Sequence, residues 1–403
     1  MNRIWRFIAA RALNTFGRAV ITTTVLWELY ERTGDKLVLA AVGMMQVIPV
    51  IALFIPSGWL ADHVDRRRLA TVAALGTGVV GIGLAIASTI MAPIPAYLGL
   101  LLLQGSVVAI HAPATSSLLA NIGPRAILPR ANRMLSSLSE TAQITAPALA
   151  GFALLYVEPR YVFAAVGITA IASAVLYHSL GAGHHHLRPS SDPAVPTTDW
   201  RVGLRFIFKT PLLLSALTLD MFAILFAGVM ALLPAIATDI LGVGSFGYGI
   251  LRASQPIGAV VMALVGGRIP AWRRPGRVLL LIVALYGVAT IGVGLSTWLP
   301  LTAACLFACG ALDNISVVIR LTLEQLVVPD AIRGRVAAVH NVFIGMSNEL
   351  GAAESGAAAA LVGTVPAIVG GGVIAVVVVA VIVVKWPQLA AMPPLAQLKS
   401  PDG

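Results

Sequence analysis

The chain has 403 residues, of which 58% are hydrophobic and only 11% are charged. Its mean hydropathy is +0.90, and a soluble fold of this composition would expose far more apolar surface than water tolerates. These values exclude an ordinary soluble domain and indicate a protein that crosses a membrane many times, since each helical crossing needs about 20 apolar residues.

Twelve apolar runs follow one another along the chain. Each run is continuously apolar and lacks the alternation of a barrel strand, so each is predicted to be a membrane-spanning helix that satisfies its own backbone hydrogen bonds. The first run follows Arg3 and Arg6 without a small-residue cleavage site, which favours a retained helix over a signal peptide. The predicted spans are residues 8–30, 38–60, 69–90, 96–119, 132–156, 161–180, 211–237, 246–267, 276–297, 299–320, 335–358 and 364–384.

Basic residues are unevenly divided between alternate loops. If the N-terminus is inside, only Arg32, Lys36 and Arg160 fall outside, whereas the other loops carry many arginines and lysines. The positive-inside rule then places both termini in the cytoplasm. The net charge of +10 is therefore explained by topology. No nucleic-acid partner is expected, because a nucleic-acid binder gathers its basic residues on one folded face.

The longest polar stretch, residues 181–210, follows the sixth run and divides the chain into halves. We predict an N-terminal six-helix bundle over 1–180, a cytoplasmic central loop over 181–210, a C-terminal bundle over 211–385 and a cytoplasmic tail over 386–403. The halves also echo each other. The segment from Pro124 to Arg130 returns 205 residues later at Pro329, and the glycine that opens the charged loop at Gly58 returns at Gly266. Both echoes favour an ancient duplication.

A short charged motif separates the second and third runs. It reads Gly58-Trp-Leu-Ala-Asp62-His-Val-Asp-Arg66-Arg67. With twelve spans in two halves, this motif resembles the major facilitator superfamily. More narrowly, residues 317–351 resemble the branch that contains enterobactin exporters and macrolide efflux proteins. The resemblance implies an all-α membrane protein of twelve helices in two pseudo-symmetric bundles, located in the bacterial cytoplasmic membrane.

The resemblance also implies a role for this motif as a cytoplasmic latch. By position, Asp62 is the latch acid, Gly58 allows close helix approach, and Arg66 and Arg67 are the basic partners. Charge-assisted hydrogen bonds between such groups and a helix terminus are strong, yet a small movement breaks them. The sequence departs from the family pattern at two positions of the motif, His63 and Asp65. The alternative is that these charges only enforce topology.

Charged residues within the first span provide the next candidates, because an ionisable side chain in hydrocarbon costs at least about 2.5 to 3.5 kcal/mol on insertion scales. Arg11, Asn14 and Arg18 fall on one face of a helix. We expect this face to line the substrate pathway, with Arg18 near mid-membrane and Arg11 closer to the cytoplasm. Two arginines that merely reach toward the membrane surface are the alternative, which suits Arg11 better.

Asp220 in the seventh span also reaches mid-depth, and in the resembled fold helices 1 and 7 are neighbours. We therefore expect Arg18 and Asp220 to form a buried pair whose separation triggers proton uptake. A static salt bridge is the alternative. Arg320, at the cytoplasmic end of the tenth span, is expected to reach the membrane surface or to join the latch of the second half. Further pathway candidates within spans are Gln104, His111, Glu140, Arg252, Asp313 and Glu349, the last preferred over Glu354.

The remaining groups of reactive side chains do not predict catalysis. Cys305 and Cys309 are expected to be core thiols, His184–His186 do not define a metal site, and no phosphate-binding loop is present. We expect no cofactor, no metal and no enzyme activity. The predicted function is proton-coupled export of a siderophore-like or drug-like molecule by a monomer in the lipid bilayer. Uptake, lipid flipping and a non-transporting membrane sensor remain alternatives.

Overall fold

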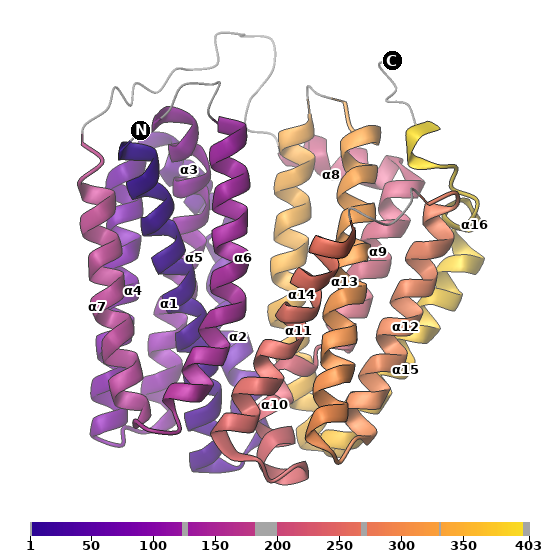
Figure 1. Ribbon diagram of the computed structural model, residues 1–403. Helices are drawn as coiled ribbons and strands as arrows, with labels where there is room; N and C mark the ends of the chain where they lie inside the picture. Colours follow the sequence, from indigo (N-terminus) through magenta and orange to yellow (C-terminus); the bar gives the residue numbers. More distant parts are fainter. Residues whose placement is uncertain (1, 123–127, 182–199, 267–271, 330–331, 398–403) are drawn as a thin grey trace. The chain divides into compact units, whose positions relative to one another are not determined.

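The computed structural model describes residues 2–122, 128–181, 200–266, 272–329 and 332–397. These residues form helices and no β-strand (Figure 1). Every predicted apolar run overlaps one helix or a series of consecutive helical elements. Eight of the helices in the described part are long and apolar enough to cross a membrane. The expected all-α membrane fold is confirmed.

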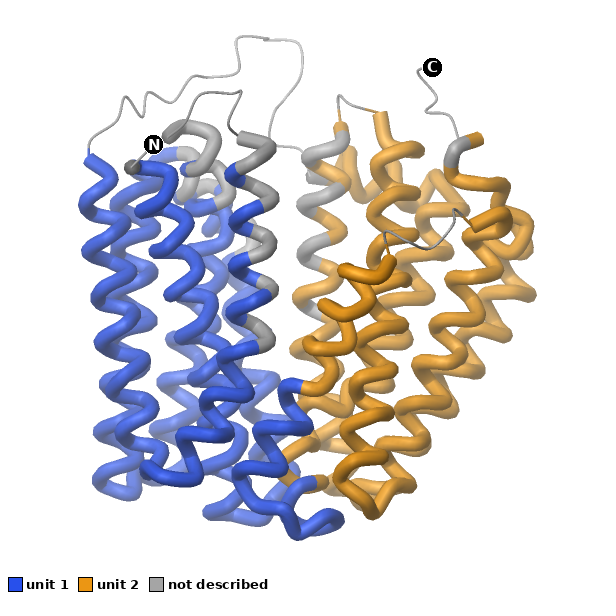
Figure 2. The backbone as a smooth tube through the Cα atoms, viewed as in Figure 1, with its two compact units in different colours: residues 1–189, 237–253 blue, residues 190–236, 254–403 orange. Residues whose placement is uncertain are grey.

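The chain divides into two compact units (Figure 2). Unit 1 comprises residues 1–189 and 237–253, and unit 2 comprises residues 190–236 and 254–403. Within unit 1, α4 packs closely against α5 and α7, and α1 packs against α6 and α7. The helices of unit 1 are α1 (Asn2–Thr33), α2 (Lys36–Ala52), α3 (Phe54–His63), α4 (Arg66–Thr89), α5 (Ile94–Ile122), α6 (Leu128–Ala153), α7 (Pro159–His178) and the first part of α11 (Gly244–Gly266).

In unit 2, α12 packs closely against α13 and α15, and α14 packs against α8, α9 and α15. The seventh predicted span is interrupted, because α9 ends at Phe226 and shorter helical turns follow it. The elements are α8 (Trp200–Lys209), α9 (Pro211–Phe226), η1 (Val229–Leu232), α10 (Leu233–Ala235), η2 (Ile236–Ile240, shared with unit 1), the rest of α11, α12 (Pro275–Leu295), α13 (Leu299–Val327), α14 (Arg333–Val362), α15 (Thr364–Lys385), α16 (Pro387–Ala390) and η3 (Leu395–Gln397).

Two contacts made by glycines recur at the offset of the sequence echoes. In unit 1, a Cβ atom on Gly81 of α4 would lie 2.8 Å from the backbone of Gly167 in α7. In unit 2, a Cβ atom on Gly287 of α12 would lie 2.7 Å from the backbone of Gly372 in α15. Small residues let membrane helices approach this closely. The second contact lies 205 to 206 residues after the first, which supports the predicted duplication.

The second recurring contact involves a glycine and a glutamine carbonyl. A Cβ atom on Gly105 of α5 would lie 2.6 Å from the carbonyl oxygen of Gln46 in α2, and one on Gly310 of α13 would lie 1.7 Å from that of Gln255 in α11. Gly310 again follows Gly105 by 205 residues. The two units therefore share helix contacts as well as sequence echoes.

Residues 237–253 join unit 1 through aromatic side chains. The Tyr248 hydroxyl donates a hydrogen bond of 3.0 Å to the carbonyl of Thr23 in α1, and the Tyr248 ring stacks on Trp27. The Tyr30 hydroxyl donates to the carboxylate of Asp239. This segment belongs to the second half in the expected division of the chain, whose domain boundaries stay a prediction.

Candidate functional site

In unit 2, Asp220 of α9 forms a buried ion pair with Arg320 of α13. Asp220 is 6% exposed and Arg320 is 2% exposed. Arg320 also donates from Nε to the Ser316 hydroxyl one turn earlier on α13, at 3.2 Å. The Arg320 guanidinium therefore hydrogen-bonds to side chains on two helices. A buried charge requires such partners to offset the loss of hydration.

A second buried pair lies one turn further along α13. The Glu324 carboxylate is in hydrogen-bond contact with Nδ1 of His340 on α14. Both side chains are at most 5% exposed. Because Arg320 and Glu324 are four residues apart, they share one face of α13. His340 also acts electrostatically on Asp220, so the four side chains form one buried cluster, called here the charge cluster.

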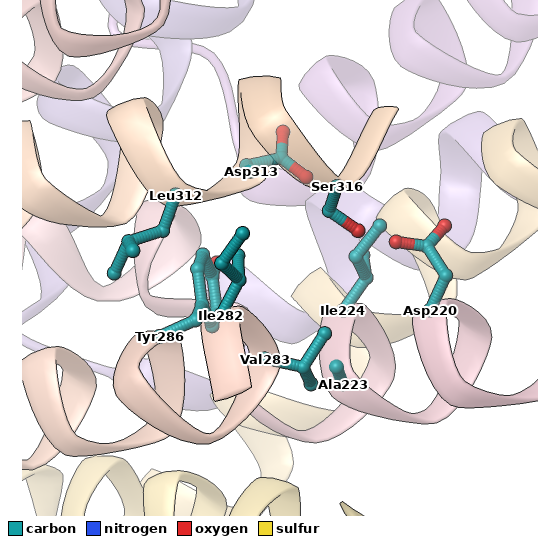
Figure 3. A pocket seen from close by; sticks show the side chains of 9 residues that line it. All are labelled: Asp220, Ala223, Ile224, Ile282, Val283, Tyr286, Leu312, Asp313 and Ser316. Carbon is teal, nitrogen blue, oxygen red and sulfur yellow. The ribbon is translucent and has the colours of Figure 1, made fainter. Parts of the chain in front are cut away.

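A pocket opens beside the charge cluster. Figure 3 shows the carboxylate of Asp220 and the hydroxyl of Ser316 pointing toward each other at one end of it, with Asp313 nearby on α13. Tyr286 of α12 closes the opposite end. The empty space is about 260 Å³, part of it open to the exterior. Because that figure includes open solvent, the enclosed part is far smaller than a pocket for a drug-sized ligand, so the pocket suits water or one part of a substrate.

The partner found for Asp220 differs from the expected one. The sequence favoured Arg18, whereas the ion pair described for Asp220 is with Arg320 of the same unit. The expectation that Arg320 reaches the membrane surface is wrong, because its side chain is buried and faces α9. The error came from ending the tenth span at Arg320, whereas α13 continues to Val327.

Unit 1 contains polar side chains of a different kind. Asn14 of α1 donates to the Thr77 hydroxyl of α4 at 3.4 Å, and Nε2 of His111 on α5 lies 3.2 Å from the Tyr177 hydroxyl of α7. Arg11 and Arg18, both partly buried on α1, act electrostatically on His111. The structure therefore brings together three of the predicted pathway residues, the two arginines and His111.

Hydrogen-bonding capacity in this interior is incompletely used. Gln104 is 2% exposed, and neither its amide nitrogen nor its amide oxygen has a hydrogen-bond partner among the described residues. The amide oxygen of Asn14 is buried and also lacks a described partner. Buried polar atoms are normally hydrogen-bonded. These atoms are therefore available to a polar ligand or to water.

The predicted latch lies around the start of α4. Asp65 caps this helix, because its carboxylate accepts hydrogen bonds from the backbone of Arg67 and Arg68 at 2.8 and 3.4 Å. Arg67 donates through its side chain to the carbonyl of His178 at 3.2 Å, and Arg66 lies partly buried in the first turn. The departure from the family pattern at Asp65 thus has a structural role as a helix cap.

The other two latch residues are less informative. Asp62 lies in α3, but its side chain is outside the described residues. A Cβ atom on Gly58 would meet no described atom within 4 Å. The expectation that Gly58 permits close helix approach therefore stays a prediction.

The remaining predicted pathway residues are dispersed. Arg252 on α11 and Glu349 on α14 are partly buried, as are Asp313 on α13 and Glu354 on α14. The side chain of Glu140 and the residues His184–His186 lie outside the described residues. Cys305 and Cys309 are free thiols, and Cys309 is buried. Of these residues, Asp313 lines the pocket beside the charge cluster.

Sequence reasoning missed Glu324 and His340. Glu324 was placed outside the tenth span, and His340 was read as part of an ordinary eleventh span. The spacing of Arg320 and Glu324 in an apolar helix was the available signal, since opposite charges four residues apart on a membrane helix mark a face that meets polar partners.

Comparison with known families decides the class of protein. The family model described as Major Facilitator Superfamily matches residues 7–352. The chain belongs to the Major Facilitator Superfamily. It is thus a multi-pass membrane protein of a transporter family and not an enzyme.

Among curated relatives, the chain is similar to the enterobactin exporter EntS of Escherichia coli O127:H6, with 27% identity over 348 residues, which cover 82% of this chain and 78% of that protein. It is 28% identical to the enterobactin exporter EntS of Shigella flexneri over 286 residues. That match covers 69% of this chain and 66% of the relative, just under two thirds of its length.

Solved structures of this superfamily share the fold. A bacterial homolog of the human lysosomal transporter Spinster, in an inward-facing and occupied conformation, has a TM-score of 0.76 with 16% identity, over 99% of this chain and 98% of that chain. The POT family transporter PepTSo has a TM-score of 0.71 with 14% identity, over 97% and 99% of the two chains. At these identities the likeness concerns the fold alone.

Proposed function

We propose that this superfamily member is a secondary active transporter that exports a small organic molecule by proton-coupled alternating access. The observation that carries the proposal is the similarity to enterobactin exporters along 82% of the chain. The protein lies in the bacterial cytoplasmic membrane with both termini in the cytoplasm, an orientation that the distribution of basic residues favours. The protein acts as a monomer with protons as the second partner.

The interior of unit 1 favours an anionic cargo. Arg11 and Arg18 supply positive charge beside His111, and the unpartnered amide of Gln104 supplies a donor and an acceptor. Guanidinium groups bind carboxylate and phenolate-type oxygens through several parallel hydrogen bonds. A siderophore-like molecule with acidic groups fits this chemistry better than a cationic drug does.

The charge cluster of unit 2 supplies the coupling. Buried charges in membrane segments are retained where they serve ion or substrate pathways. A change in protonation there alters the free energy of burying the cluster, and so biases the equilibrium between conformations. Proton movement down its gradient in this way drives export of the substrate against its own concentration gradient.

The test compares cells that contain the protein with cells that lack it. Intracellular enterobactin and a macrolide are measured in a strain without its own exporters. Export predicts lower enterobactin in the cells that contain the protein, and dissipation of the proton gradient abolishes the difference. Higher intracellular enterobactin would indicate uptake. No effect on either compound, together with altered distribution of a fluorescent lipid between leaflets, would replace the proposal with lipid flipping.

A further inference from the structure

The charge cluster is not electrically balanced when its histidine is neutral. Asp220 and Glu324 carry negative charges, and Arg320 carries a positive charge that it does not release in proteins. With His340 neutral, the formal charge summed over these four side chains alone is one negative charge. All four side chains are at most 6% exposed, and a buried uncompensated charge is strongly unfavourable. One additional proton makes the cluster neutral.

The contacts decide where this proton is held. Arg320 donates directly to Asp220, so the charge of Asp220 is compensated within that ion pair. The Glu324 carboxylate is the other acidic group of the cluster, and its described partner is Nδ1 of His340. An additional proton either converts His340 to imidazolium or neutralises Glu324. In both cases it belongs to the Glu324–His340 pair.

The other ring nitrogen of His340 provides the route for the proton. Nε2 is buried and has no hydrogen-bond partner among the described residues. A histidine bonded through Nδ1 alone keeps Nε2 open to water, and imidazole passes protons between its two nitrogens by exchange with such partners. Because this nitrogen is buried, proton exchange with the aqueous phase requires a conformation in which it is accessible.

The electrostatic surroundings of His340 come from several helices. Asp220 on α9 and Arg320 with Glu324 on α13 form the cluster itself. Of the elements packed against α14, α8 is basic and α15 carries a lysine at its end, and Glu324 is the acidic group in described contact with the ring. The other charged residues on these elements, on α13 and on α14 are Arg201, Arg205, Lys209, Asp313, Arg333, Arg335, Glu349, Glu354 and Lys385.

We propose that the Glu324–His340 pair is the proton-binding site of the transporter, an inference that rests on the proposed proton-coupled export. With one proton bound, the cluster is neutral and stays buried as observed. Loss of that proton leaves a negative charge that favours entry of water and separation of α14 from α13. Asp220 and Arg320 hold the neighbouring positions and do not carry the transported proton.

The test uses inside-out vesicles that contain the full chain, with enterobactin as the probe. Accumulation driven by an imposed pH gradient requires proton coupling, whereas exchange of labelled for unlabelled enterobactin at equal concentrations requires no net proton movement. In His340→Gln and Glu324→Gln, gradient-driven accumulation is expected to fall at least tenfold, while exchange stays within about threefold of the wild type. His178→Gln and Glu158→Gln are matched controls, because both residues are exposed.

The outcomes separate this inference from the proposed function. Wild-type vesicles that show no gradient-driven accumulation contradict proton-coupled export itself. Wild-type accumulation that survives in both glutamine variants, within twofold of the controls, overturns the proton site alone. Loss of accumulation and exchange together, in variants that are folded by size-exclusion chromatography, also overturns it, because that result indicates a substrate site.

A double variant covers the case in which single substitutions do not fold. Replacement of a buried ionic pair by apolar residues of similar volume is often neutral for stability. E324L/H340L is therefore expected to fold, to exchange enterobactin and to show no gradient-driven accumulation. Gradient-driven accumulation by this variant would contradict the assignment.

Discussion

The two units differ most at positions that their repeat makes equivalent. Six and ten residues after Gly105, helix α5 of unit 1 carries His111 and Thr115. At the same distances after Gly310, helix α13 of unit 2 carries Ser316 and Arg320. The Thr115 hydroxyl donates to the carbonyl of His111 within its own helix, at 2.9 Å, whereas Arg320 bonds to Asp220 on another helix.

This difference separates two uses of buried polarity. Around Asn14 and His111 of unit 1 the hydrogen bonds are long, and the Gln104 amide has no described partner, which leaves its donor and acceptor available to a ligand. Unit 2 has close ion pairs between helices, which respond to a change in charge. Under the proposed function, unit 1 supplies the binding chemistry and unit 2 the charge-sensitive chemistry.

The largest expected effect breaks the charge cluster. Arg320→Leu leaves Asp220 buried without its partner, and loss of one member of a buried pair costs about 3 to 5 kcal/mol of stability. Thermal unfolding of the purified protein in detergent is the measurement. The double variant D220L/R320L, which removes both charges, is expected to recover most of that loss. A single variant as stable as the wild type would mean that water reaches Asp220.

The next effect concerns the repeated glycine contact. Gly310→Ala places a Cβ atom 1.7 Å from the carbonyl oxygen of Gln255, and such overpacking costs about 1 to 3 kcal/mol. Gly105→Ala, at 2.6 Å from Gln46, is expected to cost less. Gly370→Ala is the control, because nothing lies within 4 Å of its added Cβ atom. Equal unfolding temperatures for all three variants would contradict the close packing.

A transport measurement sharpens the role of unit 1. Arg18→Ala removes positive charge near His111, and enterobactin efflux is expected to fall at least tenfold, about 1.4 kcal/mol of interaction energy. Arg160→Ala serves as the charge control, since Arg160 is partly buried and pairs with the exposed Glu158. If Arg18→Ala exports enterobactin as fast as the control does, anion recognition in unit 1 is excluded.

The smallest expected effect concerns the cap of α4. Asp65→Ala removes the carboxylate that accepts from the backbone of Arg67, and loss of such a cap costs about 0.5 to 2 kcal/mol. Asp65→Asn retains an acceptor and is expected to stay near the wild type. Helix α12, the equivalent of α4 in unit 2, begins after Arg274 without a side-chain cap. Thermal unfolding of both variants checks the contrast, and equal stability of Ala and Asn would refute it.

Much of the fold was predictable, because hydropathy and length determine where membrane helices lie. The predicted first span 8–30 lies within α1, and the span 364–384 lies within α15. The break after Phe226 was not predictable, because the apolar run continues through it while the backbone turns at Gly228. Hydropathy reports burial in lipid and is insensitive to such a turn.

The candidate site was only partly predictable. The shared face of Arg11, Asn14 and Arg18 followed from helical periodicity, and the structure places both arginines near His111. The partner of Asp220 did not follow, because pairing between helices depends on rotation about each helix axis, which one sequence leaves open. The contact between Glu324 and His340 was missed for the same reason.

The paired glycines Gly81 with Gly167 and Gly287 with Gly372 carry an evolutionary consequence. Neither pair tolerates a larger side chain without a shift of backbone, so selection holds the spacing of these helices fixed in both copies of the repeat. Changes in the transported substrate are then confined to interior positions that do not determine the distance between helices, such as Thr115 and Arg320. New substrate specificities are accordingly expected to arise by substitution of a few polar residues while the helix packing stays the same.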